Sequence, residues 1–273
     1  MVNNYQCNEE YNISFIPQDV FEKHVENTIN AYKETLNKID LKKFNSNIID
    51  PIKLTFDKSL FRKSWEETIE LEIHRQRDKT NNNAIGYFHQ NLFRYIKNCI
   101  VPKEGFDVIY TRENGTHICV EMKDKHNTMN ANSSQKTYIN MQNHLIRFPN
   151  DECYLVEVLA PKSRNITWEI MVDKKHCSCD KIRRVSIDQF YKIVTGIDNA
   201  FYQICSQLPK TIDKLIRLDK VKTVQEDTVI FELRKKNPNL LKALYLLAFE
   251  SYLGFEDEIE KLNIELSNYS SQN

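Results

Sequence analysis

Two charged residues, Glu121 and Lys123, stand two positions apart in an apolar run of the chain. Val120 and Met122 flank Glu121, and the alternation predicts a β-strand in which every second side chain shares a face. Glu121 and Lys123 should therefore leave the same face of a sheet. A carboxylate and an ammonium group held there can coordinate a divalent cation and act on its bound water. The tripeptide alone is a weak signal, because Glu-x-Lys is common on exposed strand edges.

The position of Asp107 depends on the turn before this strand. The chain alternates on both sides of Asn114-Gly115, which predicts a β-hairpin. A two-residue loop would set Asp107 opposite Met122, on the wrong face. A three-residue loop over 113–115 would set it opposite Glu121, and the glycine in the last loop position favours this second register.

Two carboxylates held this close repel each other unless a cation lies between them. We predict Mg²⁺, held by Asp107, Glu121 and the main-chain carbonyl of Met122, with positions left for water and a phosphate oxygen. Lys123 would orient or deprotonate the attacking water and offset charge on the phosphorane. Asp107, Glu121 and Lys123 are thus the predicted catalytic residues, and the predicted reaction is metal-assisted phosphodiester hydrolysis.

The surrounding sequence predicts the elements that hold this site. After a break at residues 81–83, apolar residues recur every three or four positions and predict a helix over 84–98. A second helix is predicted over 135–147, capped by Ser133 or Ser134, and an apolar strand over 153–159. The second hairpin strand, this helix and this strand would form a βαβ unit with a right-handed crossover.

The rest of the chain is predicted to be mainly helical. Helices are expected over residues 17–38 and 64–77, and another starts at Ser186. A strand is expected over 166–172. An extended segment, 228–233, would precede a helix over 240–253, and residues 267–273 should be frayed.

These elements predict an α/β fold with a central mixed sheet of four or five strands flanked by helices. We interpret residues 1–273 as a single domain. It would have a helical N-terminal region (1–83), a catalytic core (84–175) and a mainly helical C-terminal region (185–265).

Composition narrows the function classes. Lys and Arg total 38, as do Asp and Glu, so no general affinity for polyanions follows from charge. The five glycines form neither a dinucleotide-binding motif nor a P-loop. Seven scattered cysteines without a signal peptide indicate the reducing cytoplasm, and no run approaches the roughly 18 to 20 apolar residues of a membrane helix.

The site resembles the PD-(D/E)xK nuclease superfamily, with Phe106-Asp107 at the PD position and residues 121–123 as ExK. Phe106 departs from the usual proline. More narrowly, the stretches 120–130, 133–138 and 183–191 are similar to Type II restriction endonucleases of the group that cuts GGNCC-type sites. The resemblance implies a single endonuclease domain that cuts both strands of duplex DNA, alongside a methyltransferase that protects the host genome. A palindromic site read by one kind of chain predicts a homodimer.

Several residues near the strand that carries Glu121 and Lys123 are candidates for DNA binding. Lys125, His126 and Asn127 follow the strand directly and can reach phosphates, although a solvated loop also explains them. Gln135 and Lys136 begin the next helix, where the N-terminus favours anions. An ordinary first turn explains them equally well.

Other candidates lie further from the predicted metal. Arg183 and Arg184, in a basic run, can make bidentate contacts to guanine or can form a solvated patch, and Arg164 and Asn165 carry less weight. Gln90 is the possible accessory residue on the helix before the hairpin. Glu70 and Glu72 are its alternatives.

Three further readings stay open. A repair or recombination nuclease would read DNA structure instead of sequence, and a noncatalytic DNA-binding module would use the acidic pair only structurally. His176, Cys177 and Cys179 suggest zinc, but their spacing is too compressed for an ordinary structural site and no second pair completes it.

Overall fold

The computed structural model describes residues 11–126, 129–218 and 226–249. The chain forms two compact units, one of Met1–Ala31 with Asn83–Val221 and one of Tyr32–Asn82 with Lys222–Asn273. We call them the sheet unit and the helical unit. The single domain predicted over residues 1–273 stays a prediction, because two compact units can still fold and act as one.

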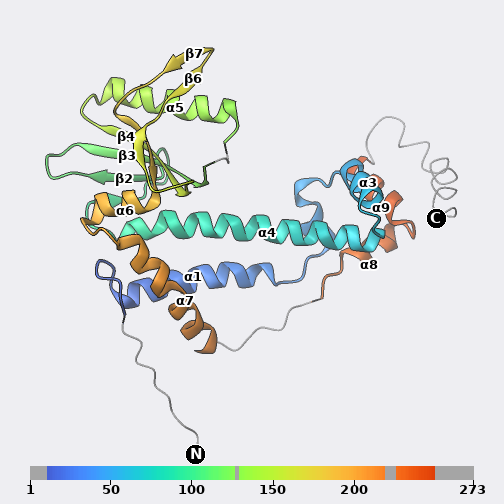
Figure 1. Ribbon diagram of the computed structural model, residues 1–273. Coiled ribbons are helices and arrows are strands. Elements are labelled where there is room, and N and C mark those ends of the chain that lie inside the picture. Colours follow the sequence, from blue (N-terminus) through green and yellow to red (C-terminus); the bar gives the residue numbers. More distant parts are fainter. Residues whose placement is uncertain (1–10, 127–128, 219–225, 250–273) are drawn as a thin grey trace, which may run out of the picture. The chain divides into compact units, whose positions relative to one another are not determined.

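The sheet unit is built on a six-stranded mixed sheet (Figure 1). Its strands lie in the order β1 (Cys99–Ile100), β2 (Val108–Thr111), β3 (His117–Lys125), β4 (Glu152–Leu159), β8 (Ile182–Ser186) and β5 (Asn165–Thr167). The central three, β3, β4 and β8, are parallel, and the outer three pair antiparallel. The predicted α/β class and mixed sheet are therefore confirmed, with six strands instead of four or five.

Strand β8 was missed by the sequence prediction because two arginines interrupt its apolar pattern. It pairs in parallel with β4 over residues 182–186, so the sheet continues beyond the core boundary predicted at residue 175. The strand predicted over 166–172 is divided. Its first part is β5, and its second part, β6 (Ile170–Val172), forms a separate two-stranded sheet with β7 (Lys175–Cys177).

The hairpin between β2 and β3 has the predicted three-residue loop. Thr111 pairs with His117, and the Arg112 amide donates to the Thr116 carbonyl at 2.9 Å. Gly115 closes the loop with φ of +81°, a conformation that an L side chain rarely adopts. The residue pairing ends with Val108 opposite Val120, and the amide of the preceding residue, Asp107, donates to the Val120 carbonyl at 2.8 Å. The predicted pairing of Asp107 with Glu121 stays a prediction.

Helices cover both faces of the sheet (Figure 1). On one face, α5 (Ala131–Arg147) buries Tyr138 and Met141 against Leu155 of β4. On the other face, Val120 and Val156 pack with residues of α6 (Ile187–Thr195) and α7 (Ala200–Leu218) and with parts of α1 (Gln18–Thr35) and α4 (Trp65–Leu92). Burial on both faces is typical of parallel strands.

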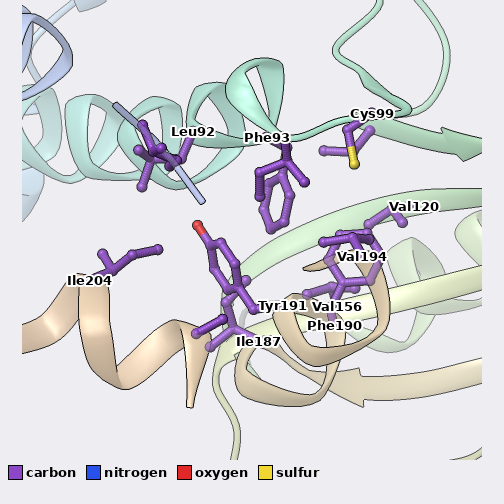
Figure 2. Packing of buried hydrophobic residues seen from close by; sticks show 14 of the residues in the cluster. Leu92, Phe93, Cys99, Val120, Val156, Ile187, Phe190, Tyr191, Val194 and Ile204 are labelled. Carbon is purple, nitrogen blue, oxygen red and sulfur yellow. The ribbon is translucent and has the colours of Figure 1, made fainter. Parts of the chain in front are cut away.

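An aromatic group forms the centre of this second layer (Figure 2). Phe93 stacks on Tyr191 with ring centroids 4.7 Å apart, and Phe190 lies 4.9 Å from Phe93. All three side chains are fully buried, which contributes roughly 1.5–3 kcal/mol for each large apolar side chain. This packing fixes the end of α4 against the sheet.

The predicted break at residues 81–83 is wrong, because α4 runs through it without interruption. Each asparagine costs at most about 0.7 kcal/mol relative to alanine in a helix, which packing easily offsets. Asn82 also donates to Asp78 one turn earlier, at 2.9 Å. The helix predicted to end at residue 98 ends at Leu92 instead, and the 3₁₀ turn η2 (Phe93–Tyr95) leads into β1.

The helical unit contains α2 (Leu41–Phe44), η1 (Asn45–Asn47), α3 (Pro51–Leu60), α8 (Val229–Lys236), α9 (Leu240–Phe249) and the first part of α4. The predicted extended segment 228–233 is wrong, since it falls in α8. Val229 and Leu233, four apart, are both fully buried on one helical face. The predicted continuation of α9 to residue 253 and the tail 267–273 lie outside the described residues.

The starts of helices α5 and α6 are held by contacts that the sequence did not predict. Asn130 caps α5 by accepting from the Ser133 amide at 2.8 Å, so neither Ser133 nor Ser134 is the cap. Ser186 does precede α6, but its hydroxyl bonds to the main chain of Arg164 instead of to the helix. None of the helices in the described part of the chain is both long and apolar enough to cross a membrane.

Candidate active site

The Asp107 carboxylate lies just beyond the last residue pair of β2, beside the part of β3 that no longer pairs with β2. The Asp107 amide donates to the Val120 carbonyl at 2.8 Å, and Asp107 Oδ2 accepts from the Met122 amide at 2.7 Å. Because the N–H and C=O of one strand residue point to the same side, the Met122 carbonyl faces this edge as well. Two of the three predicted metal ligands are thus adjacent through the hairpin register.

The predicted site also requires the side chains of Glu121 and Lys123 to lie on the same face of β3, and they do. Lys123 Nζ lies 2.6 Å from Glu121 Oε1, and the two side chains are 29% and 26% exposed. An ion pair in this half-buried setting keeps the ammonium next to the carboxylate. A cation that took the Glu121 oxygens would release the ammonium toward a neighbouring water or phosphate.

The electrostatics of Asp107 favour a bound cation. Burial raises the pKa of the Asp107 carboxyl above its ordinary value. The hydrogen bond from the Met122 amide and the charge of Lys123 oppose this rise, whereas Glu121 adds to it. The donor set, two carboxylates and a main-chain carbonyl, consists of the hard oxygen ligands that Mg²⁺ prefers, so the residues present fit the predicted ion.

Gln90 is the accessory candidate that the structure places against Asp107. Its Nε2 lies 3.2 Å from the Asp107 carbonyl oxygen and 3.3 Å from Oδ1. Glu70 and Glu72 belong to the helical unit, where Glu70 is exposed and buried Glu72 pairs with Arg75. The sequence pointed to Gln90 as the accessory residue because it lies on the helix directly before the hairpin.

A cleft of about 500 Å³ opens beside Glu121. One wall is formed by Gly105, Phe106 and Glu121. The other wall is one face of α5, whose lining residues are Ser133, Lys136, Thr137, Asn140, Met141, Asn143, His144 and Arg147. The wall thus presents two cations and two amides, which are donors suited to phosphate and sugar oxygens.

Among the predicted DNA-binding residues that the structure describes, Lys136 is the one that lines this cleft. Sequence reasoning missed Asn140, Asn143 and Arg147. Their signal was present, because they follow Lys136 at intervals of three or four residues and so share its helical face. Because α5 begins at Ala131, four residues before its predicted start, Gln135 lies in the second turn, where it is half-buried and does not line the cleft.

Lys125 and His126 lie exposed where β3 ends. The His126 carbonyl accepts from Arg184 at 3.2 Å, so this end of the strand is held to β8. Asn127 lies outside the described residues.

The arginines of β8 are paired within the protein and do not form a solvated patch. Arg183 donates to Asn165 at 2.6 Å through Nε. Arg184 and Arg164 both contact Glu157, whose side chain is 1% exposed. Glu157 lies beside Lys123 in the parallel register of β3 and β4, and sequence reasoning missed it because it sits in an apolar strand.

His176 and Cys177 lie on β7, and Cys179 follows two residues after its end. His176, on β7, is 3.6 Å from Glu169. Cys177 and Cys179 are partly buried against the apolar cluster between α5 and the sheet.

A mixed sheet between helices, with two carboxylates and a lysine at the end of a hairpin, defines a nuclease with the restriction-endonuclease-like fold. The sequence model described as "Eco47II restriction endonuclease" matches residues 13–217, and the chain belongs to this family. The matched span contains Asp107, Glu121 and Lys123. The protein is therefore a restriction endonuclease, an enzyme that acts on double-stranded DNA.

Two relatives agree with this assignment. The Type II restriction enzyme Sau96I of Staphylococcus aureus is 30% identical over 267 residues, which cover 95% of this chain and 98% of the relative. The Type II restriction enzyme Eco47II of Escherichia coli is 27% identical over 184 residues, which cover 64% and 76%. The resemblance drawn from the sequence is thereby confirmed at the level of the family. Restriction endonucleases typically use a divalent metal ion.

Proposed function

We propose that this chain is a Mg²⁺-dependent Type II restriction endonuclease that hydrolyses both strands of duplex DNA at a short palindromic site of GGNCC type. Asp107, Glu121 and Lys123 are the proposed catalytic residues. The observation that supports the proposal is the hydrogen bond of 2.7 Å from the Met122 amide to the Asp107 carboxylate, which holds Asp107 beside the strand that carries Glu121 and Lys123. The GGNCC type of site rests on the sequence resemblance, which the match to Sau96I supports.

The roles of the residues follow from their contacts. Asp107, Glu121 and the Met122 carbonyl would hold Mg²⁺, which supplies Lewis acidity to the phosphate and acidifies a bound water. Lys123 would move from Glu121 to the attacking water, which it orients by hydrogen bonding, and would offset charge on the phosphorane. Gln90 would act through Asp107 as a positioning residue.

DNA binding falls to the residues around this centre. Lys136 borders the cleft beside Glu121, and Lys125 and His126 extend from the end of β3. Gln135 and Asn127 remain proposed contacts from their positions in the sequence. Arg183 and Arg184 would need to exchange their contacts with Asn165 and Glu157 for bases, so their proposed role includes this rearrangement.

A twofold homodimer is the proposed active form, because a palindrome presents the same half-site to each subunit. A methyltransferase of the same specificity would protect the host DNA. Such a pair acts on DNA inside the cell, which makes the cytoplasm the proposed location. A sedimentation experiment on the DNA complex tests the dimer, since a monomer that still cuts both strands at once would refute it.

Plasmid digestion with and without Mg²⁺ tests the proposed reaction. Wild-type protein should yield discrete fragments only with Mg²⁺, and sequenced fragment ends should reveal one palindromic site. Lys123→Ala and Glu121→Ala should abolish cleavage while DNA binding in a mobility-shift assay survives. Lys23→Ala is the matched control, because Lys23 is 68% exposed on α1.

The rival functions give different results in the same assay. Preferential cleavage of branched or damaged DNA would favour a repair nuclease. If Glu121→Ala left function unchanged and no unmodified DNA were cut, a noncatalytic binding module would replace the proposal.

A further inference from the structure

Three side chains with different metal-binding groups meet on the face of the sheet that α5 covers. They are Cys119 of β3, His144 of α5 and Asp151, which directly precedes β4. One ligand atom from each lies within 4.8 Å of the others. Cys119 Sγ is 3.4 Å from His144 Nε2, and that nitrogen is 2.9 Å from Asp151 Oδ2.

These separations are close to those of a tetrahedral zinc site. Zinc–ligand distances of about 2.0–2.3 Å set neighbouring ligand atoms roughly 3.3–3.6 Å apart. The sulfur–nitrogen distance already fits, and the nitrogen–oxygen pair needs to open by only a few tenths of an ångström. An ion at this point would replace the two present hydrogen bonds.

The scaffold holds two of the ligands in place. Asp151 Oδ1 accepts from the His117 amide at 2.9 Å, which leaves Oδ2 directed at His144. The His144 ring packs edge-on against Phe106 at 5.2 Å and lies 4.9 Å from Phe148. Such outer contacts orient metal ligands and are a regular part of zinc sites.

His117 stands next to this cluster, although its ring is not one of the three groups whose ligand atoms lie within 4.8 Å of one another. His117 is two residues before Cys119 in β3, so both side chains leave the same face of the sheet. Its Nδ1 lies 3.3 Å from Asp151 Oδ1. Cys119 is 1% exposed and Asp151 is 6% exposed, which leaves the His117 side as the more open side of the cluster.

The donor chemistry separates this cluster from the proposed Mg²⁺ site. A thiolate and imidazoles favour Zn²⁺, whereas Mg²⁺ takes oxygen ligands. We propose that Cys119, His144 and Asp151 bind one structural Zn²⁺ ion that ties α5 and the start of β4 to β3, and that His117 completes the site by rotation of its side chain. Because α5 forms one wall of the cleft beside Glu121, the ion would fix the width of that cleft.

Metal binding by the untagged, full-length protein tests this proposal without reference to cleavage. Protein stripped with a chelator is given Zn²⁺ or Co²⁺, desalted and analysed for metal. The wild type should retain about one ion per chain, and Co²⁺ should give the absorption of a tetrahedral site with a thiolate-to-cobalt band. Cys119→Ser should remove that band and weaken zinc binding by at least about tenfold.

Matched variants keep the result decisive. Cys205→Ser changes an exposed cysteine of α7 and should leave the cobalt spectrum intact, and Asp107→Asn should do the same. If Cys119→Ser does not fold, Asp151→Asn takes its place, because it preserves size while it removes the carboxylate. A wild type that retains no ion, or a Cys119→Ser protein that retains Zn²⁺ as tightly with an unchanged cobalt spectrum, would overturn the proposal.

Discussion

The Gln90 side chain donates to Asp107 from the helix side, at 3.2 Å to the carbonyl oxygen and 3.3 Å to Oδ1. From the strand side, the Met122 amide donates to Oδ2 of the same carboxylate at 2.7 Å. The carboxylate is therefore held between α4 and β3 before any ion binds. Its orientation depends on a residue seventeen positions away in the chain.

Gln90→Ala should lower cleavage because it frees the Asp107 carboxylate on one side. Loss of such an outer contact typically costs about 10- to 100-fold in metal affinity or activity. We expect the Mg²⁺ concentration for half-maximal cleavage to rise, as measured from initial rates on plasmid DNA. Gln18→Ala, on an exposed part of α1, is the control. An unchanged Mg²⁺ dependence in Gln90→Ala would remove Gln90 from the site.

Glu157→Gln should destabilise the sheet unit. It removes the charge that Arg164 and Arg184 share, and their side chains are only 15% and 26% exposed. Removal of one partner from a buried ion pair costs about 3–5 kcal/mol. Urea denaturation measures the change in unfolding free energy. Glu66→Gln, which breaks a surface pair with Arg234, should cost less than about 1 kcal/mol, and equal losses in both variants would contradict this account.

Lys136→Ala should weaken DNA binding without sequence preference, since an ammonium group on the cleft wall contacts phosphate and not a base. The slope of log affinity against log salt concentration should fall by about one. Fluorescence anisotropy with cognate and non-cognate duplexes measures both quantities. The exposed Lys23→Ala variant should retain the wild-type slope. A selective loss for the cognate duplex alone would show that Lys136 reads sequence instead.

Stability should fall as the pH drops below about 6.5. Burial lowers the pKa of His24, and the charge of Arg94 adds to this effect, while the hydrogen bond to the Phe88 carbonyl opposes it. The unfolded chain therefore takes up the proton first, so the stabilisation is complete above the unfolded pKa and is lost as the pH falls through the folded one. The unfolding free energy of the wild type should be higher at pH 7.5 than at pH 5.5, by roughly 1.4 kcal/mol for each tenfold difference in the proton affinity of His24 between the unfolded and folded states.

His24→Phe should reduce this pH dependence, because the variant has no proton to take up at that position. His89, whose pKa burial also lowers, should keep part of it. If His24→Phe kept the full wild-type pH dependence of stability, that dependence would arise from a group other than His24.

The sequence by itself predicted the proposed catalytic residues, because the information was local. Alternation set the faces of β3, and one glycine selected the three-residue loop, so the hairpin that brings Asp107 beside β3 followed from turn chemistry. The α/β class followed in the same way from helical and strand periods. Family membership confirms the kind of enzyme that these residues indicate.

Only the tertiary structure decided what lies around the triplet. Asn140 and Arg147 share one face of α5, but no local pattern says that this face borders Glu121. The contact between Gln90 and Asp107 likewise joins two separate elements. Strand β8 was hidden by two arginines, which are accommodated because Arg184 pairs with Glu157 of β4 and Arg183 donates to Asn165. Helix α4 continues through three asparagines because their small local cost is outweighed by packing along the helix. Contacts between distant segments, not local preference, set these features.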